Sequence, residues 1–326
     1  MPNTLIVLPR PGATISGKAR SIQAPSEAAF VATFGSLLPA ASYMQTTHGR
    51  AAYYELSPSS SVPADCKKPI TRVIFVHGVQ TPAIGLQPLA STLSSRFPYA
   101  QCVLVDLWGH GLTETPVVPH DATLFHSLLE ALLGHLGWDN AHFVGYSFGG
   151  STTASFAAAY PERVASMALV APAGLLRSAQ FDDVEKSYLR GGEGVEDNAQ
   201  EWIMEWLNGG KLVVPSDWKE RVQRGEVVAE AVRNWQMKEH EGHPASVVGI
   251  FRDGGALDKH ADFAEAAKKD IRNLCVLGEL DDICSMQDLN SIGMHNVHVV
   301  PQVGHGVVRQ EVAEVARLIE EFWNNL

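Results

Sequence analysis

From residue 70 onward the chain alternates short, unbroken apolar runs with segments of helix length. A strand whose two faces are both covered by helices has no polar face, so its sequence is continuously apolar instead of alternating. Six runs have this character: residues 71–76, 102–106, 142–146, 165–171, 272–277 and 297–300. Helical patterns between and after them cover residues 86–96, 122–136, 151–160 and 312–324. This order predicts an α/β fold with a mostly parallel central sheet flanked by helices.

The other segments predict additions to this core. Residues 1–40 are rich in Pro, Ala and Ser and hold one possible helix, 26–38, so we expect an N-terminal extension draped on the main domain. Residues 43–56 contain two β-type runs joined by a turn with a glycine, which is typical of a hairpin.

Residues 177–267 hold helical patterns, notably at 198–207 and 217–241, and no convincing strand. An insertion between two strands at the carboxyl edge of a sheet predicts a helical cap over the site. The expected organisation is an extension (1–40), a core (41–176 and 268–326) and a cap (177–267).

Charge and hydropathy exclude several classes of partner. The formal net charge is −11 and no stretch is a basic stripe, which argues against a nucleic-acid partner. No run approaches the roughly 18 apolar residues of a membrane-spanning helix. The first residues have too short an apolar run and no charged start for a secretory signal. The oligomeric state cannot be deduced from these features.

The four cysteines show no CxxC pair and no regular spacing; they are Cys66, Cys102, Cys275 and Cys284. Cys102 and Cys275 lie in predicted core strands, where a reduced thiol behaves as a small apolar side chain. This favours a reducing compartment, so we expect a cytoplasmic protein.

One predicted strand leads into a serine between glycines, Gly145-Tyr146-Ser147-Phe148-Gly149, and small residues that can open a helix follow it. A serine hydroxyl is a poor nucleophile unless it is exposed, deprotonated by a base and faced by donors for the oxyanion that it creates. A sharp strand-to-helix turn exposes it, and flanking glycines avoid clashes with the strained backbone. We therefore predict that Ser147 is a nucleophile.

Three further strand ends carry residues that fit nucleophilic catalysis by Ser147. His77-Gly78-Val79 follows the run 71–76, and the backbone N–H groups of Val79 and Phe148 would together form an oxyanion hole. By itself His77-Gly78 is equally consistent with a plain turn.

Near the C-terminus, the run 272–277 ends in acidic residues (Glu279, Asp281 and Asp282), and the run 297–300 is followed by His305 between glycines. Strand ends of a parallel sheet share one edge, so these groups can converge on Ser147.

With these motifs in the order Ser, Asp, His, the sequence resembles the α/β-hydrolase superfamily over about residues 43–176 and 268–326. The resemblance implies that Asp281 is the acid that orients His305, with Asp282 and Glu279 as alternatives. It also implies an acyl-enzyme mechanism that requires no cofactor and no metal. Asp106 in the run 106–111 would be structural, and Trp108, where relatives often have proline, is expected to line the pocket.

Aromatic residues of the expected cap suggest an apolar substrate: Phe181, Trp202, Trp206, Trp235 and Phe251. Each of them is equally expected to pack the cap onto the core. As substrate-binding residues we predict Trp108, Tyr146, Trp202, Trp206 and Trp235.

The remaining histidines are given structural interpretations. His240 and His243 lack the HExxH spacing of a zinc site, so we expect a solvated helix end there. His110 and His126 are expected on the surface.

Three functions fit these features. The first is hydrolysis of a carboxylic ester or lactone of a small to medium apolar substrate. The second uses the same residues for C–C bond hydrolysis or acyl transfer. The third is a non-catalytic ligand-binding protein on this fold. Epoxide or haloalkane hydrolysis is disfavoured, because such relatives place a carboxylate where this chain has Ser147.

Overall fold

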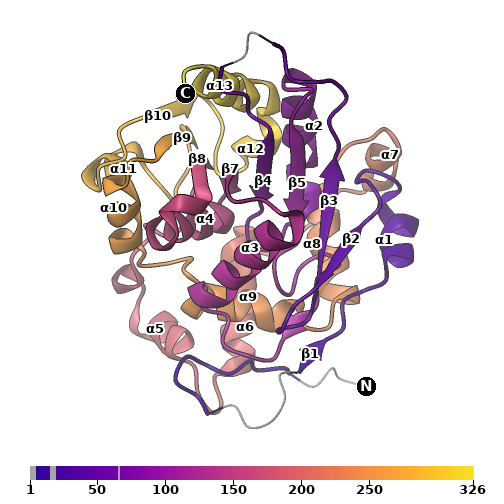
Figure 1. Cartoon of the computed structure of the whole chain (residues 1–326). Helices are drawn as coiled ribbons and strands as arrows, with labels where there is room; N and C mark the ends of the chain where they lie inside the picture. Colours follow the sequence, from indigo (N-terminus) through magenta and orange to yellow (C-terminus); the bar gives the residue numbers. More distant parts are fainter. Residues whose placement is uncertain (1–4, 15–19, 65–66) are drawn as a thin grey trace.

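The computed structural model describes residues 5–14, 20–64 and 67–326. Its centre is an eight-stranded sheet with the order β10-β9-β8-β7-β4-β5-β3-β2 (Figure 1). The strands are β2 (Ser42–Gln45), β3 (Arg50–Leu56), β4 (Arg72–Val76), β5 (Gln101–Val105), β7 (Ala141–Tyr146), β8 (Val164–Val170), β9 (Arg272–Gly278) and β10 (Val297–Val300). Strands β5, β4, β7, β8, β9 and β10 run parallel, whereas β3 is antiparallel to β5. The six predicted runs are these parallel strands, so the predicted α/β-hydrolase fold is confirmed.

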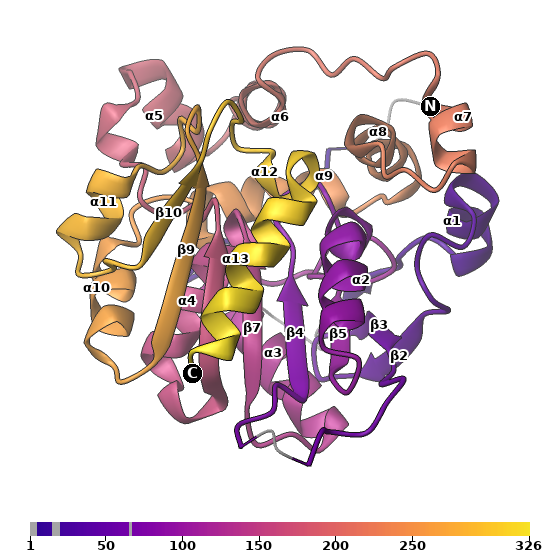
Figure 2. The same cartoon turned by 90° about the horizontal axis from the view of Figure 1, so that it is seen from above.

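Helices cover both faces of the sheet, as the continuous apolar strands require (Figure 2). In β4, Ile74 and Val76 pack on the face covered by α3 (Ala122–Leu136), α4 (Phe148–Ala159) and α10 (His260–Lys268). Val73 and Phe75 of the same strand pack on the opposite face, under α2 (Gln87–Arg96) and α13 (Val312–Asn324). Side chains alternate across a strand, so β4 buries apolar surface on both faces and its sequence shows no alternation.

The N-terminal segment packs on later parts of the chain. Strand β1 (Ser21–Ile22) pairs with β6 (Thr115–Pro116), and β2 and β3 form the predicted hairpin. Helix α1 (Glu27–Phe34) is capped by Ser26, whose side chain accepts a hydrogen bond from the N–H of Ala29. It ends earlier than the predicted 26–38 because Gly35 takes a left-handed φ of 62°.

Between β8 and β9 the chain is helical and lies over the carboxyl edge of the sheet (Figure 2). The pattern over 217–241 is divided into two helices, because Gly225 turns the chain at a φ of 89°. The helices here are α5 (Asp183–Arg190), α6 (Glu196–Asn208), α7 (Trp218–Gln223), α8 (Ala229–Glu239), α9 (His243–Gly249) and a π-helical turn (Ile250–Gly254). The short helix η3 (Ser178–Gln180) also lies in this segment, and the short helices elsewhere are η1 (Ala83–Leu86), η2 (Pro161–Arg163), α11 (Met286–Ser291) and α12 (Val307–Gln310). The division into extension, core and cap stays a prediction.

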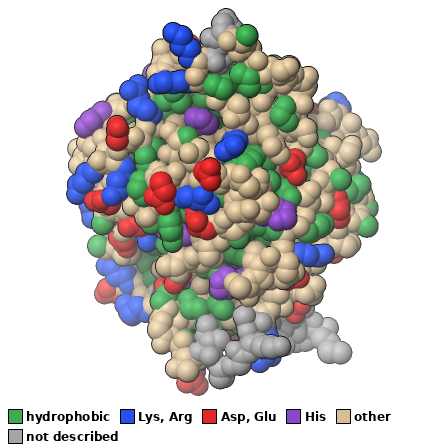
Figure 3. Space-filling view, in the orientation of Figure 1, with side chains coloured by type: hydrophobic (Ala, Val, Ile, Leu, Met, Phe, Trp, Pro, Cys, Tyr) green, Lys and Arg blue, Asp and Glu red, His purple; other side chains and the backbone are tan. Residues whose placement is uncertain are grey.

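The surface and the thiols add two observations. On the face seen in Figure 3, acidic and basic side chains are interspersed. Cys102, Cys275 and Cys284 are buried free thiols, and Cys66 lies outside the described residues. In the described part of the chain, no helix combines the length and the apolar character needed to cross a membrane.

Candidate active site

Ser147 occupies a sharp turn between β7 and α4. Its φ of 54° and ψ of −120° are unfavourable for a residue with a side chain. Hydrogen bonds hold this conformation: its N–H donates to the carbonyl of Val170 (3.1 Å), and its own carbonyl accepts from Gly150 (2.9 Å) and Ala173 (2.9 Å). The neighbouring chain therefore maintains a backbone geometry that aims the hydroxyl away from the sheet edge.

The two flanking glycines are required by close approach of the backbone. A Cβ on Gly145 would lie 2.5 Å from the carbonyl oxygen of Gly149. A Cβ on Gly149 would overlap the carbonyl oxygen of Val76 in the adjacent strand. Neither oxygen can move without displacing helix α4 or strand β4, so the predicted reason for these glycines has a direct structural basis.

Ser147, His305 and Asp281 form one chain of hydrogen bonds. The Nε2 of His305 lies 2.9 Å from the Oγ of Ser147, and its Nδ1 lies 3.1 Å and 3.2 Å from the two carboxylate oxygens of Asp281. A carboxylate only accepts, so Nδ1 carries the proton and Nε2 is free to accept from the serine hydroxyl. Burial by itself lowers the pKa of His305, but Tyr146 and Asp281 raise it above its usual value. The imidazole is thus suited to take up a proton.

The three predicted alternatives for the acid are clearly separated by the structure. The side chain of Asp281 is fully buried and also accepts a hydrogen bond from the N–H of Ile283 at 2.9 Å. Glu279 is exposed and accepts from the N–H of Gln302, and Asp282 is exposed beside the cavity described below. Within the described residues, Asp281 is the carboxylate that meets His305.

The loop after β4 passes directly over Ser147. His77 is buried, its Nδ1–H donates to the carbonyl of Gly78 (2.7 Å), and its Nε2 accepts from the N–H of Leu107 (2.9 Å). Burial lowers the pKa of His77 to about 4, so the ring stays neutral in this tautomer. Phe148 is the first residue of α4, so its N–H has no partner within the helix. Of the two predicted oxyanion donors, Phe148 follows Ser147 directly in the chain, and Val79 lines the same cavity as Ser147.

Hydrogen bonds from two distant segments fix the turn that carries Val79. Gln80 has a φ of 63°, its N–H donates to the Nε2 of His110 (3.2 Å), and its carbonyl accepts from the side chain of Gln236 (2.7 Å). Gln236 in turn accepts from the N–H of Gly111 (2.7 Å). The sequence analysis missed Gln236, because nothing in the local pattern of α8 distinguishes it from a surface residue.

The loop after β5 is structural. Asp106 is buried and accepts hydrogen bonds from the hydroxyl of Tyr54 (2.8 Å) and the N–H groups of Ala83 and Leu112 (both 2.9 Å). Burial raises its pKa to about 6, although these hydrogen bonds lower it in part. Trp108 is fully buried in the core, so it does not line the cavity at Ser147.

The expectation of solvated histidines is wrong. His110, His126, His240 and His243 are all buried. The rings of His77, His110, His243 and His240 follow one another with centroid separations of 5.2, 4.7 and 6.2 Å. These rings lie where the ends of α8 and α9 meet the loops after β4 and β5. Their burial depends on how these distant segments pack together, which the local sequence does not show. No group of three or more residues suited to holding a metal occurs in the described ranges.

A cavity of about 630 Å³ opens above Ser147 and His305. Of the predicted substrate-binding residues, Tyr146 and Trp206 line it. Trp202 lies outside its lining and packs on Phe181 and Phe251, and its Nε1–H donates to Glu185. Trp235 packs instead on the two phenylalanines of α1. Further lining residues that the sequence analysis missed are Thr81, Leu176, Asn208, Arg233, Ile283 and Arg309.

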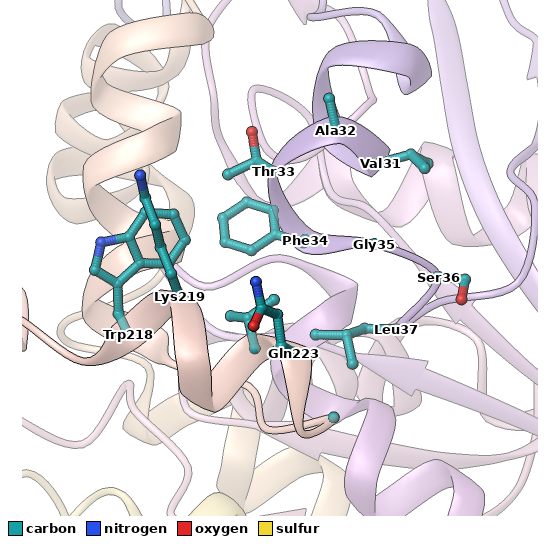
Figure 4. Close-up of a pocket in the computed structure, with 12 residues that line it drawn as sticks. Val31, Ala32, Thr33, Phe34, Gly35, Ser36, Leu37, Trp218, Lys219 and Gln223 are labelled. Atoms are coloured by element: carbon teal, nitrogen blue, oxygen red, sulfur yellow. The ribbon is translucent and has the colours of Figure 1, made fainter.

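A second hollow, of about 780 Å³, lies between α1 and α7 and is lined by residues 31–37 and residues of α7 (Figure 4). In this view Phe34 projects from the end of α1 toward Trp218 of α7, and Lys219 lies beside Trp218. Neither Ser147 nor His305 lines it, so it is separate from the candidate active site.

Comparison with known proteins gives a family match and curated relatives that include hydrolases, a putative synthase and acetyltransferase components. The profile of the alpha/beta hydrolase fold family matches residues 71–203. A 2-(acetamidomethylene)succinate hydrolase of Mesorhizobium japonicum is 28% identical over 125 residues, which is 38% of this chain and 44% of that protein. The chain therefore aligns with less than half of the length of this curated relative.

Two solved structures extend the similarity to most of the chain. An enol-lactonase of Burkholderia xenovorans superposes with a TM-score of 0.62 at 16% identity, over 87% of this chain and all of that one. A meta-cleavage product hydrolase of Pseudomonas fluorescens superposes with a TM-score of 0.60 at 19% identity, over 89% of this chain and 98% of that one. At such identities the superpositions establish the fold.

Proposed function

The chain belongs to the α/β-hydrolase superfamily, and from that premise we propose that it is a serine hydrolase that cleaves a carboxylic ester or lactone through an acyl-enzyme on Ser147. The observation that carries the proposal is the hydrogen-bonded chain Ser147–His305–Asp281 at 2.9 Å and 3.1 Å. Its atoms have the roles that acyl transfer requires, and they face a cavity large enough for a small to medium substrate.

In the first half of the reaction, the Oγ of Ser147 attacks the carbonyl carbon while its proton passes to the Nε2 of His305. The carbonyl oxygen becomes an oxyanion, which accepts hydrogen bonds from the N–H groups of Val79 and Phe148. Asp281 stabilises the imidazolium that forms. Collapse of the intermediate expels the alkoxide, which takes the proton from His305 and leaves as the alcohol.

In the second half, water attacks the acyl carbon and gives its proton to the same Nε2. When the second tetrahedral intermediate collapses, the bond between the acyl carbon and Oγ breaks, Nε2 returns the proton to Oγ, and the acid is released. For a lactone, the alcohol and the acid are the two ends of one product. Trp206 and Tyr146 are the predicted aromatic contacts that remain in the proposal, because both line the cavity.

The test is labelling with a fluorophosphonate, which phosphonylates an activated serine. The wild-type protein should gain one adduct, located on Ser147 by mass spectrometry, and Ser147→Ala should gain none. Ser151→Ala is a matched control, because Ser151 lies one turn further along α4 and its hydroxyl donates to the carbonyl of Gly255 (2.6 Å). Labelling of Ser147→Ala, or no labelling of a folded wild type, would refute the assignment of the nucleophile.

A second candidate, C–C bond hydrolysis, is favoured by the structural similarity to the meta-cleavage product hydrolase. It uses the same residues, and the product identifies it. Incubation with an ester and with a vinylogous β-diketone acid, each with methanol as a competing acceptor, separates the reactions. Formation of acid and alcohol from the ester supports the ester proposal. Cleavage of the diketone alone supports the C–C alternative. Formation of a methyl ester with methanol indicates acyl transfer.

A further inference from the structure

Two arginines line the cavity that contains Ser147, and they come from different elements. Arg233 projects from α8, where its Nη1 donates to the side chain of Asn208 (3.2 Å) and its Nε lies 3.5 Å from the hydroxyl of Thr81. Arg309 projects from α12, four residues after His305, and its guanidinium carbon lies 5.2 Å from the ring centre of Tyr146. Two cations therefore face the space that holds the nucleophile.

Neither guanidinium is neutralised by a carboxylate. Across residues 5–14, 20–64 and 67–326, no ion pair within 4.0 Å involves Arg233 or Arg309, whereas the buried Arg252 pairs with Glu196 at 2.7 Å. The Nη1 of Arg309 is buried and has no hydrogen-bond partner. The carboxylates that line the cavity, Glu205 and Asp282, lie beyond ion-pair distance.

The electrostatics agree with this geometry. Burial lowers the pKa of Arg233, and the charge of Arg309 lowers it further, whereas Tyr146 and Glu230 oppose this only in part. Burial by itself would raise the pKa of Tyr146, but Arg309, His305 and Arg233 outweigh it and lower that pKa below its usual value. Partly desolvated cations that repel one another and lack a counter-ion are costly, and an anion bound between them removes much of that cost.

We propose that Arg233 and Arg309 form a carboxylate-binding subsite, so that the substrate is an ester or lactone with a free carboxylate at one end. This inference rests on the proposed function of Ser147. Apolar side chains, among them Leu176, Trp206 and Phe251, line another part of the cavity, beside polar ones such as Thr81 and Asn208. The cavity therefore has a cationic part and an apolar part, and the reacting carbonyl would lie at Ser147 with the carboxylate at the arginines.

The direct test compares two esters of the same alcohol that differ at the far end of the acyl chain. One is the mono-p-nitrophenyl ester of glutaric acid, which carries a free carboxylate, and the other is p-nitrophenyl pentanoate, which is neutral. Wild-type protein should have a kcat/KM at least about 10-fold higher for the charged ester, because hydrogen bonds to charged groups contribute about 1.5–3 kcal/mol. A preference for the neutral ester would overturn the subsite.

Substitutions test whether Arg233 and Arg309 cause the preference for the charged ester. Arg309→Gln and Arg233→Gln should each lower the ratio of kcat/KM, charged over neutral, by about 10- to 100-fold, mainly through a higher KM for the charged ester. Arg317→Gln is the control, since Arg317 is exposed on α13 and pairs with Glu314 and Glu321. An unchanged ratio in both cavity variants would refute the inference; two variants are used in case one does not fold.

A binding readout separates this inference from the proposed function. Glutarate should slow fluorophosphonate labelling of the wild type and should have at least 10-fold less effect on Arg309→Gln, whereas pentanamide and inorganic phosphate should protect weakly. Stronger protection by phosphate would overturn carboxylate as the ligand. Normal labelling without protection by glutarate would refute the subsite alone, and absent labelling of Ser147 would refute the proposed function.

Discussion

Acidification should unfold this protein because of its buried histidines. His77, His240 and His243 are fully buried, and burial lowers their pKa values from the usual 6.5 to about 4, 4 and 3. Burial, together with the neighbouring histidines, also lowers the pKa of His110 well below its usual value. When the pH falls through 6.5, the unfolded chain binds protons at these residues and the folded chain does not. The free energy of unfolding is therefore fully present above pH 6.5 and falls from there toward the folded pKa values.

The magnitude depends mainly on the ordinary pKa of histidine. A ring that stays neutral in the folded state lowers the free energy of unfolding by about 2 kcal/mol at pH 5, so three such rings lower it by about 6 kcal/mol. Asp106 acts in the opposite direction: its folded pKa is raised to about 6, so the folded state gains its proton first and recovers about 1.4 kcal/mol by pH 5. These four groups alone give a net loss of about 5 kcal/mol, which is a large part of the stability of an ordinary domain. Burial also lowers the pKa values of His110, His120, His126 and His142, so these rings add to the loss.

The assay is urea unfolding, followed by tryptophan fluorescence and circular dichroism, at a series of pH values from 8 to 5. His126→Gln should reduce the loss between these limits by about 2 kcal/mol, because His126 is also buried and burial lowers its pKa to about 4. His298→Gln replaces an exposed ring of β10 and should leave the loss unchanged. A wild-type loss below about 2 kcal/mol, or equal losses in both variants and wild type, would show that the buried rings do not control acid stability.

Two substitutions test the active-site geometry. Gly149→Ala should lower the free energy of unfolding, measured by thermal melting, by about 1–3 kcal/mol, because the new methyl group overlaps the carbonyl of Val76. The control is Gly134→Ala, which adds a methyl group in open space on α3 and should be neutral or stabilising in the same measurement. Equal effects would contradict the close-approach argument. Asp281→Asn should lower kcat by about 10⁴-fold, because the imidazole loses its orienting charge, whereas Asp282→Asn should change kcat only a few-fold in the same ester assay. A reversed order would move the acid to Asp282.

The fold could be predicted because its signals are local. Each parallel strand is a short run with two buried faces, and β4 sends Ile74 into one layer of the core and Phe75 into the other. The candidate catalytic residues could be located for the same reason. Ser147, Asp281 and His305 follow three different strands, and a parallel sheet brings those strand ends to one edge.

The lining of the cavity could not be predicted, because it depends on which face each cap helix turns toward the core. Trp235 and Arg233 lie two residues apart on α8, yet Trp235 packs on α1 and Arg233 faces the cavity. His240, just after α8, is buried, and its Nε2–H donates to the carbonyl of Thr113, a contact across 127 residues. The sequence of α8 by itself does not show which distant residues its side chains contact.

Helix α8 links the cationic part of the cavity to the turn that carries the oxyanion donor. Arg233 faces the cavity, and Gln236, one turn later, donates to the carbonyl of Gln80 next to Val79. Residues three apart lie on the same side of a helix, so α8 cannot shift its arginine without also pulling on that turn. In the proposed mechanism, the position of this one helix would therefore influence both which substrate binds and how well its oxyanion is stabilised. For this reason, motifs at the sheet edge predict the type of chemistry but contain no information on the charge of the substrate.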